Sequence, residues 1–176
     1  MPVPSRLATI ATAIDRFSHH SGQLIAWLTL VMMLVTCMVV VLRYGFGIGS
    51  IGLQESVAYM HAIVFLLGAA FTLQRQGHVR VDILYRRFSP RRQAWVNALG
   101  SLLFLLPICG FLLAVSWNFV AESWAVREGS AQAGGLPGVY LLKALIPLMA
   151  ITLGLQGIAD IARSLVVLMS HDKERA

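Results

Sequence analysis

The chain has 176 residues, of which 57% are hydrophobic and only 12% are charged, whereas a soluble domain carries about 25% charged residues. A soluble fold of this composition would leave large apolar patches in water, so the composition excludes an ordinary soluble domain. The net charge of +6 fits the excess of Lys and Arg in the cytoplasmic loops of membrane proteins. We therefore expect membrane lipids, and no nucleic acid, as partners.

Apolar runs predict an all-α integral membrane protein with four transmembrane helices, because a helix needs about 20 apolar residues to cross a bilayer. The spans are placed at about 24–44, 55–74, 93–120 and 137–160, within a membrane domain over residues 23–165. Ser89 and Pro90 are typical of an N-cap and a first helical residue before the third span. Pro107 predicts a kink within that span, and Pro147 lies within the fourth.

Lys and Arg are distributed unevenly among the segments outside the spans. Eleven of the 14 lie in the N-terminal, middle and C-terminal segments: Arg6, Arg16, Arg75, Arg80, Arg86, Arg87, Arg91, Arg92, Arg163, Lys173 and Arg175. The two other connections hold Arg43, Arg127 and Lys143. Because Lys and Arg concentrate on the cytoplasmic side, the sequence predicts that residues 1–22, the tail 166–176 and the middle connection are cytoplasmic.

Two short segments beside the spans carry apolar residues at helical spacing. They comprise Leu7, Ile10, Ile14 and Phe17 in the first segment and Val81, Leu84, Tyr85 and Phe88 in the second. Such stripes are typical of amphipathic helices that lie in the headgroup plane. A helical extension of the adjoining span is the alternative in both cases.

Polar groups deep within a span would indicate a catalytic or transport site, because burying them there is unfavourable. No acidic residue lies at the centre of a predicted span, and Glu55 stands at the mouth of the second. His61 lies well inside that span, and we interpret it as a neutral side chain bonded to a neighbouring helix or to a partner subunit. Catalytic motifs and ligand-spaced Cys/His clusters are absent from the sequence. We therefore expect no enzyme, no catalytic or substrate-binding residue, and no metal or cofactor.

A polar segment follows the second span over residues 75–82. Gly77 suits the end of a helix, and Asp82 suits the N-cap of the surface helix predicted next. Arg75 can meet lipid phosphate or the last carbonyl groups of the span. A structural role explains each member, and the functional alternative makes Arg75, His78 and Asp82 a polar knot that fixes the turn.

Several motifs occur in a fixed order along the chain: Arg43-Tyr44-Gly45, Glu55, Leu67-Gly68-Ala69-Ala70, Arg75, His78-Val79-Arg80-Val81-Asp82, Leu136-Pro137 and Ile146-Pro147. This ordered set resembles the small membrane subunit of tripartite ATP-independent periplasmic (TRAP) transporters, the DctQ-like family, over nearly the whole chain. The resemblance implies no substrate site here. It leaves six candidates for structural or subunit contacts: Arg43, Glu55, His61, Arg75, His78 and Asp82.

In such transporters a periplasmic binding protein delivers an organic acid to a large multi-span subunit, which imports it with a sodium gradient. The resemblance implies that this chain is a scaffold subunit in a bacterial inner membrane that braces the large subunit. It would also offer surface to the binding protein, with Glu122, Arg127 and Glu128 as candidate contacts and a solvated loop as the alternative. Two other functions stay open: a membrane anchor of a redox complex, supported by His61, and a self-contained four-helix exporter.

Overall fold

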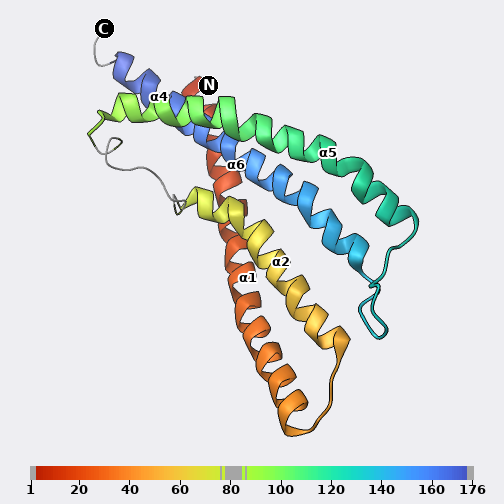
Figure 1. Ribbon diagram of the computed structural model, residues 1–176. Coiled ribbons are helices and arrows are strands. Elements are labelled where there is room, and N and C mark those ends of the chain that lie inside the picture. Colours follow the sequence, from red (N-terminus) through yellow and green to blue (C-terminus); the bar gives the residue numbers. More distant parts are fainter. Residues whose placement is uncertain (1–2, 76, 78–84, 86, 174–176) are drawn as a thin grey trace.

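The computed structural model describes residues 3–75, 77, 85 and 87–173, with side chains described between residues 6 and 170 of these ranges. The elements, drawn in Figure 1, are α1 (Val3–Gly45), α2 (Ile51–Gln74), α4 (Pro90–Gly100), a π-helical segment (Ser101–Leu105), α5 (Leu106–Ala125) and α6 (Val139–Lys173). Runs of sufficient length and hydropathy to cross a membrane are Arg6–Gly45, Ile51–Gln74, Pro90–Ala125 and Val139–Ser170. The predicted all-α class with four long apolar helices is therefore confirmed.

The arrangement of the helices is centred on α6, which lies between α2 and α5 in Figure 1. It packs against both of these helices and also against α1 and α4. The beginning of α1 and the end of α6 lie at the same end of the molecule, near the beginning of α4. Contacts of α6 therefore hold the α1–α2 pair against the α4–α5 segment.

The first helix differs from its predicted bounds, because α1 runs unbroken over 43 residues. The N-terminal stripe thus continues the first span, as in the helical-extension alternative, and does not form a separate helix. Its side chains Leu7 and Ile14 pack with Ala11 against Ala159 and Ala162 of α6. At 1.5 Å per residue α1 is about 65 Å long, well beyond a hydrocarbon core of about 30 Å.

The third predicted span comprises α4, the π-helical segment and α5. Pro90 begins α4 as expected, but the Ser89 side chain makes no capping hydrogen bond. At the predicted kink, the N–H of Leu106 donates to the carbonyl of Ser101 five residues earlier. This wider turn directly precedes Pro107, which has no N–H to donate. The second predicted amphipathic segment lies mostly outside the described residues.

The fourth helix continues beyond its predicted end at residue 160. It begins at Val139 and extends to Lys173, with Pro147 inside it. Asp160, at which the predicted span ended, bonds to Arg163, and Arg163 also bonds to Asp15 of α1. Paired charges do not have to leave the helix bundle, so the helix continues past them.

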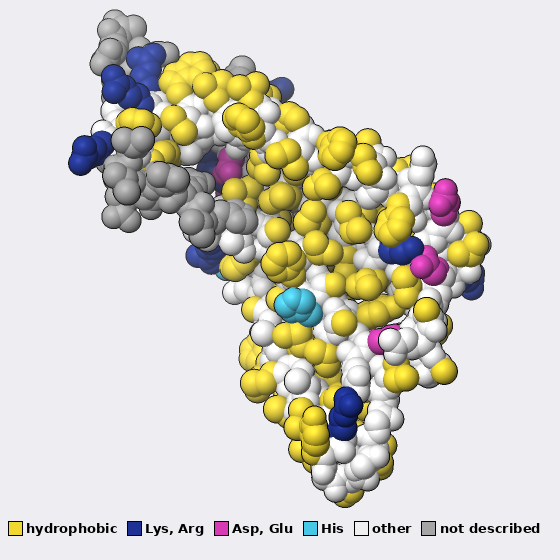
Figure 2. Space-filling view, viewed as in Figure 1, with side chains coloured by type: hydrophobic (Ala, Val, Ile, Leu, Met, Phe, Trp, Pro, Cys, Tyr) yellow, Lys and Arg dark blue, Asp and Glu magenta, His cyan; other side chains and the backbone are white. Residues whose placement is uncertain are grey.

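The interior is built from small side chains, while large apolar side chains cover the surface (Figure 2). Buried hydrophobic residues are Ala11, Ala70, Ala94, Ala98, Cys109, Ala150, Ala159, Ala162 and Leu168. Close approach is most marked at Gly22, where an added Cβ would lie 2.3 Å from Cδ2 of Phe71 on α2. Small residues at helix contacts and apolar residues outside are typical of packing within a bilayer.

Candidate functional site

A cluster of polar side chains joins α1, α2 and α6 near the end of the molecule that holds the beginning of α1. We call it the Asp15 junction, and its members are Asp15, Ser18, Gln74, Gln156, Asp160 and Arg163. Arg163 Nη1 lies 2.5 Å from Oδ2 and 2.6 Å from Oδ1 of Asp15. Arg163 Nη2 also donates to Asp160. One guanidinium thus bridges carboxylates on two helices.

Amide and hydroxyl groups complete this junction. Gln156, which is 0% exposed, donates from Nε2 to Oδ1 of Asp15 at 2.9 Å and accepts from the hydroxyl of Ser18 at 2.9 Å. Gln74 Nε2 donates to the backbone carbonyl of Asp15 at 2.7 Å. A buried amide costs free energy unless its hydrogen bonds are made, so the side chain of Gln156 favours one register between α1 and α6.

The sequence did not identify this junction, and Arg163 was counted only among the basic residues of the C-terminal segment. Gln156, Asp160 and Arg163 are spaced by four and three residues, which places them on one face of a helix. Asp15 and Ser18 are likewise three residues apart. These two polar stripes, one on α6 and one on α1, were the sequence pattern that could have pointed to a contact. Their pairing joins residues 138 to 148 positions apart, which local spacing does not predict.

A second contact, the Glu55 junction, holds the connection between α5 and α6 against the start of α2. Glu55 Oε2 accepts from the backbone N–H of Leu136 at 2.6 Å, and Oε1 accepts from the hydroxyl of Ser130. A Cβ at Gly135 would lie 2.8 Å from Oε1 of Glu55 and closer still to Ser130. Glycine at this position therefore lets the loop approach the carboxylate.

Replacing Glu55 with alanine should release this loop, because the N–H of Leu136 and the hydroxyl of Ser130 both lose their acceptor. The backbone N–H of Leu136 should then exchange with deuterium faster than in the unaltered chain. Glu55→Gln keeps one acceptor oxygen and should show a smaller increase. Gln54→Ala, at an exposed neighbouring position, is the control, and equal exchange in Glu55→Ala and Gln54→Ala would contradict the assignment.

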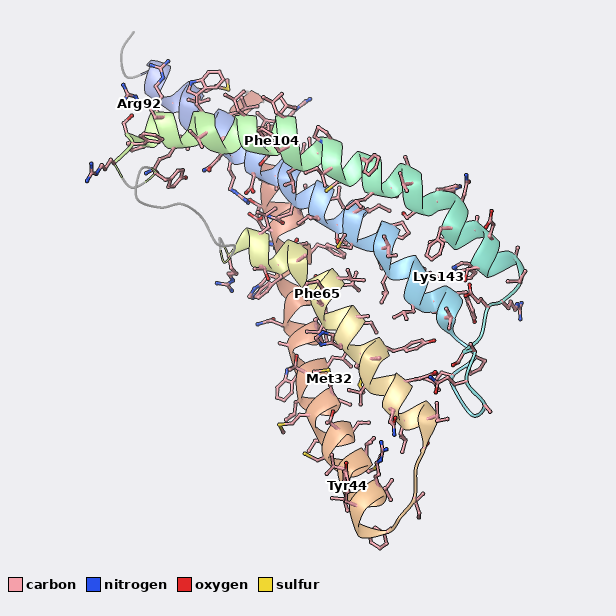
Figure 3. All side chains as sticks on the ribbon, in the orientation of Figure 1. Met32, Tyr44, Phe65, Arg92, Phe104 and Lys143 are labelled. Atoms are coloured by element: carbon pink, nitrogen blue, oxygen red, sulfur yellow. The ribbon has the colours of Figure 1, made fainter. Side chains whose placement is uncertain are left out.

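A salt bridge closes the same loop on its other side. Lys143, labelled in Figure 3 near the beginning of α6, lies with Nζ 2.5 Å from Oε2 of Glu128 and 4.1 Å from the centre of the Phe119 ring. The hydrogen bond from Lys143 holds the pKa of the Glu128 carboxyl below its usual range. Glu128 is therefore already engaged within the chain, whereas Glu122 and Arg127 are exposed.

The lowered pKa of Glu128 has a defined consequence for pH dependence. Its contribution to stability is fully present above the pKa of an unfolded glutamate, and it is lost as pH falls through the lower pKa of the folded state. A carboxyl ¹³C titration of Glu128 should give a midpoint below 4.5. In Lys143→Met the midpoint should rise, because the ammonium is gone. An unchanged midpoint in that variant would assign the shift to another cause.

Two of the six sequence candidates, His78 and Asp82, lie outside the described residues, so the predicted polar knot stays a prediction. Arg75 follows the last residue of α2, and its Nη2 lies 3.1 Å from Nδ1 of His19 on α1. Because arginine only donates, this contact uses His19 as an acceptor. Gly77 donates its N–H to the carbonyl of Thr72 at 2.9 Å, as expected for a glycine that closes a helix end.

The remaining candidates, Arg43 and His61, have exposed side chains. Arg43 lies in the last turn of α1, where a cation is favoured by the helix dipole. His61 lies on α2, and its ring stacks on the ring of Phe65 with 6.3 Å between the ring centroids. Within the described ranges, no group of three or more His, Cys, Asp or Glu side chains gathers into a site for a metal ion.

Comparison with known proteins shows which family the sequence matches. The family model described as "Tripartite ATP-independent periplasmic transporters, DctQ component" matches residues 32–167. A curated relative from Vibrio cholerae serotype O1, the C4-dicarboxylate TRAP transporter small permease protein DctQ, is 31% identical over 115 residues. The aligned segment covers 65% of this chain and 47% of the relative, so the chain spans about half the length of that protein. No solved structure matches the chain significantly.

Proposed function

The chain belongs to the DctQ family, the small permease component of TRAP transporters, and on this basis we propose that it is the static scaffold against which a larger permease subunit moves its substrate. It is a multi-pass membrane protein and a transporter component, not an enzyme. The substrate class we propose is an organic acid such as a dicarboxylate or a sugar acid, taken up with sodium.

The observation that carries the scaffold proposal is that two polar junctions attach α1 and α2 to α6 and to the loop before it. The Asp15 junction joins α1 and α2 to α6, and the Glu55 junction joins α2 to the loop before α6. A carrier that moves through the bilayer needs a fixed counterpart, and helices held by polar contacts at two places resist sliding. Asp15 and Glu55 are also occupied by groups of the chain itself, so neither carboxylate is offered to a substrate or an ion.

The distribution of Lys and Arg supports a cytoplasmic location for both termini. In that orientation the Asp15 junction lies towards the cytoplasm and the Glu55 junction towards the periplasm. The loop over residues 126–138 would then face the binding protein. Glu122 and Arg127, which are exposed near this loop, are the side chains we propose for that contact, while Glu128 holds the loop through Lys143.

Uptake by reconstituted components tests this function. Proteoliposomes that contain this chain, the large permease subunit and the binding protein should accumulate an organic acid when sodium is higher outside. This chain alone should transport nothing. Transport by the chain alone would support the exporter alternative. Equal uptake by liposomes that lack this chain would show that the scaffold is dispensable, and either result would contradict the proposal.

A further inference from the structure

The surface of α2 that the other described residues leave open is a narrow stripe. Within α2, the exposed side chains are those of Gln54, Ala58, His61 and Phe65. Their spacing of four, three and four residues follows one side of a helix, as in the seam between two packed helices. The remaining surface of α2 is partly covered by α1 and α6. The open side of α2 is thus about as wide as one helix.

A polar side chain stands in the middle of this stripe. His61 lies about 15 Å along the helix from Ile51 and about 20 Å from Gln74, close to the centre of the apolar run. Its imidazole has no hydrogen-bond partner among the residues that the structure describes, and its ring stacks on the ring of Phe65. Lipid chains offer nothing to bond with, so a donor and acceptor at this depth favour a partner protein.

The next position of the stripe is Gly68, three residues after Phe65. A Cβ built there would meet no atom of the described residues within 4 Å, so their packing does not require glycine at this place. Glycine disfavours a helix relative to alanine. In membranes, small residues on a helix surface allow another helix to approach closely. Gly68 therefore provides a shallow site beside Phe65, which is 72% exposed and labelled in Figure 3.

We propose that this α2 stripe, comprising Gln54, Ala58, His61, Phe65 and Gly68, is where one transmembrane helix of the large permease subunit packs. That helix would place a hydrogen-bonding group opposite His61 and approach the backbone at Gly68. The inference rests on the proposed function, because it takes the larger subunit as the partner. By contrast, α1 exposes apolar side chains such as Val31 and Leu34 within its apolar run, as expected for a surface that faces lipid.

A matched pair of glycine substitutions tests the stripe. Gly68 on α2 and Gly110 on α5 both lie within helices, and an added Cβ at either position meets no atom within 4 Å in the part of the chain that the structure describes. Each substitution to leucine should therefore leave the isolated fold intact, as judged by circular dichroism and a single peak in gel filtration. With a tagged chain and the co-expressed large subunit, Gly68→Leu should lower recovery of that subunit by about tenfold or more. Gly110→Leu should not change it, because the open side of α5 around Gly110 carries apolar side chains such as Ile108 and Phe111. This side of α5 carries no histidine or charged group like His61 that lipid would leave unbonded.

A photo-crosslinking amino acid identifies the occupant directly. At position 65 it should form an adduct with the large subunit, whereas at position 111, which is also exposed, it should not. An adduct with a second copy of this chain, or no protein adduct at position 65, would overturn the proposal. So would normal recovery with Gly68→Leu. If the unaltered chain fails to recover the large subunit, the proposed function itself fails. Recovery by the unaltered chain and by Gly68→Leu alike would refute the stripe alone.

Discussion

Replacing Arg163 with glutamine should lower the free energy of unfolding of the isolated chain by about 2 kcal/mol, between the values for an exposed and a fully buried ion pair. The substitution leaves the carboxylates of Asp15 and Asp160 without the guanidinium that lies between them. The expected loss is moderate because the Arg163 side chain is 38% exposed. Unfolding in mixed detergent micelles, followed by circular dichroism, measures the change.

Arg16→Gln is the matched control for this prediction. It removes the same charge from an exposed position of α1 next to Asp15, and exposed single charges change stability by about 0.5 kcal/mol or less. Equal effects of the two substitutions would mean that overall charge, and not the Asp15 junction, sets the stability. A second check is Asp15→Asn, which keeps an acceptor for Gln156 and should destabilise the chain less than Arg163→Gln.

Replacing Gly22 with alanine should destabilise the contact between α1 and α2 by about 1–3 kcal/mol, the usual range for adding volume to a packed interior. The new Cβ would lie 2.3 Å from Cγ and 2.8 Å from Cβ of Phe71. Because the Phe71 Cβ is fixed to its helix, rotation of the ring does not relieve the overlap. The two helices must move apart, and the unfolding midpoint of the isolated chain should fall.

Two further variants make this prediction specific. Gly110→Ala adds the same methyl group at an open position of α5, and it should be neutral or slightly stabilising because alanine favours a helix. Phe71→Ala combined with Gly22→Ala should recover part of the loss, since the ring that the methyl group meets is gone. A normal midpoint for Gly22→Ala would show that α1 and α2 are less tightly packed than the structure indicates.

The helices were predictable because their signal is local. Each span is a run of apolar residues, and its presence requires no knowledge of the neighbouring helices. The ends were harder to place. The sequence left open whether the segment around Leu7 and Ile14 is a separate helix or an extension of the first span, and it placed the end of the fourth span at Asp160. In both places tertiary contacts between α1 and α6 prolong a helix that hydropathy alone would end.

The junctions were less predictable, since they depend on pairs of residues that are far apart in the sequence. Glu55 was identified as a candidate from its place before the second span. Its partners Ser130 and Leu136 follow 75 and 81 residues later and carry no distinguishing pattern. Arg75 was also identified, but its contact with His19 joins two helices that only folding brings together. The sequence therefore identified Glu55 and Arg75 as candidates but did not identify the residues that they contact.

Co-purification tests the central claim most directly, because the scaffold account requires a lasting complex. The tagged chain, extracted in a mild detergent from cells that also produce the large permease subunit and the binding protein, should retain the large subunit through gel filtration. Recovery of the tagged chain without the large subunit, under conditions in which organic-acid uptake by the same cells is intact, would contradict the account.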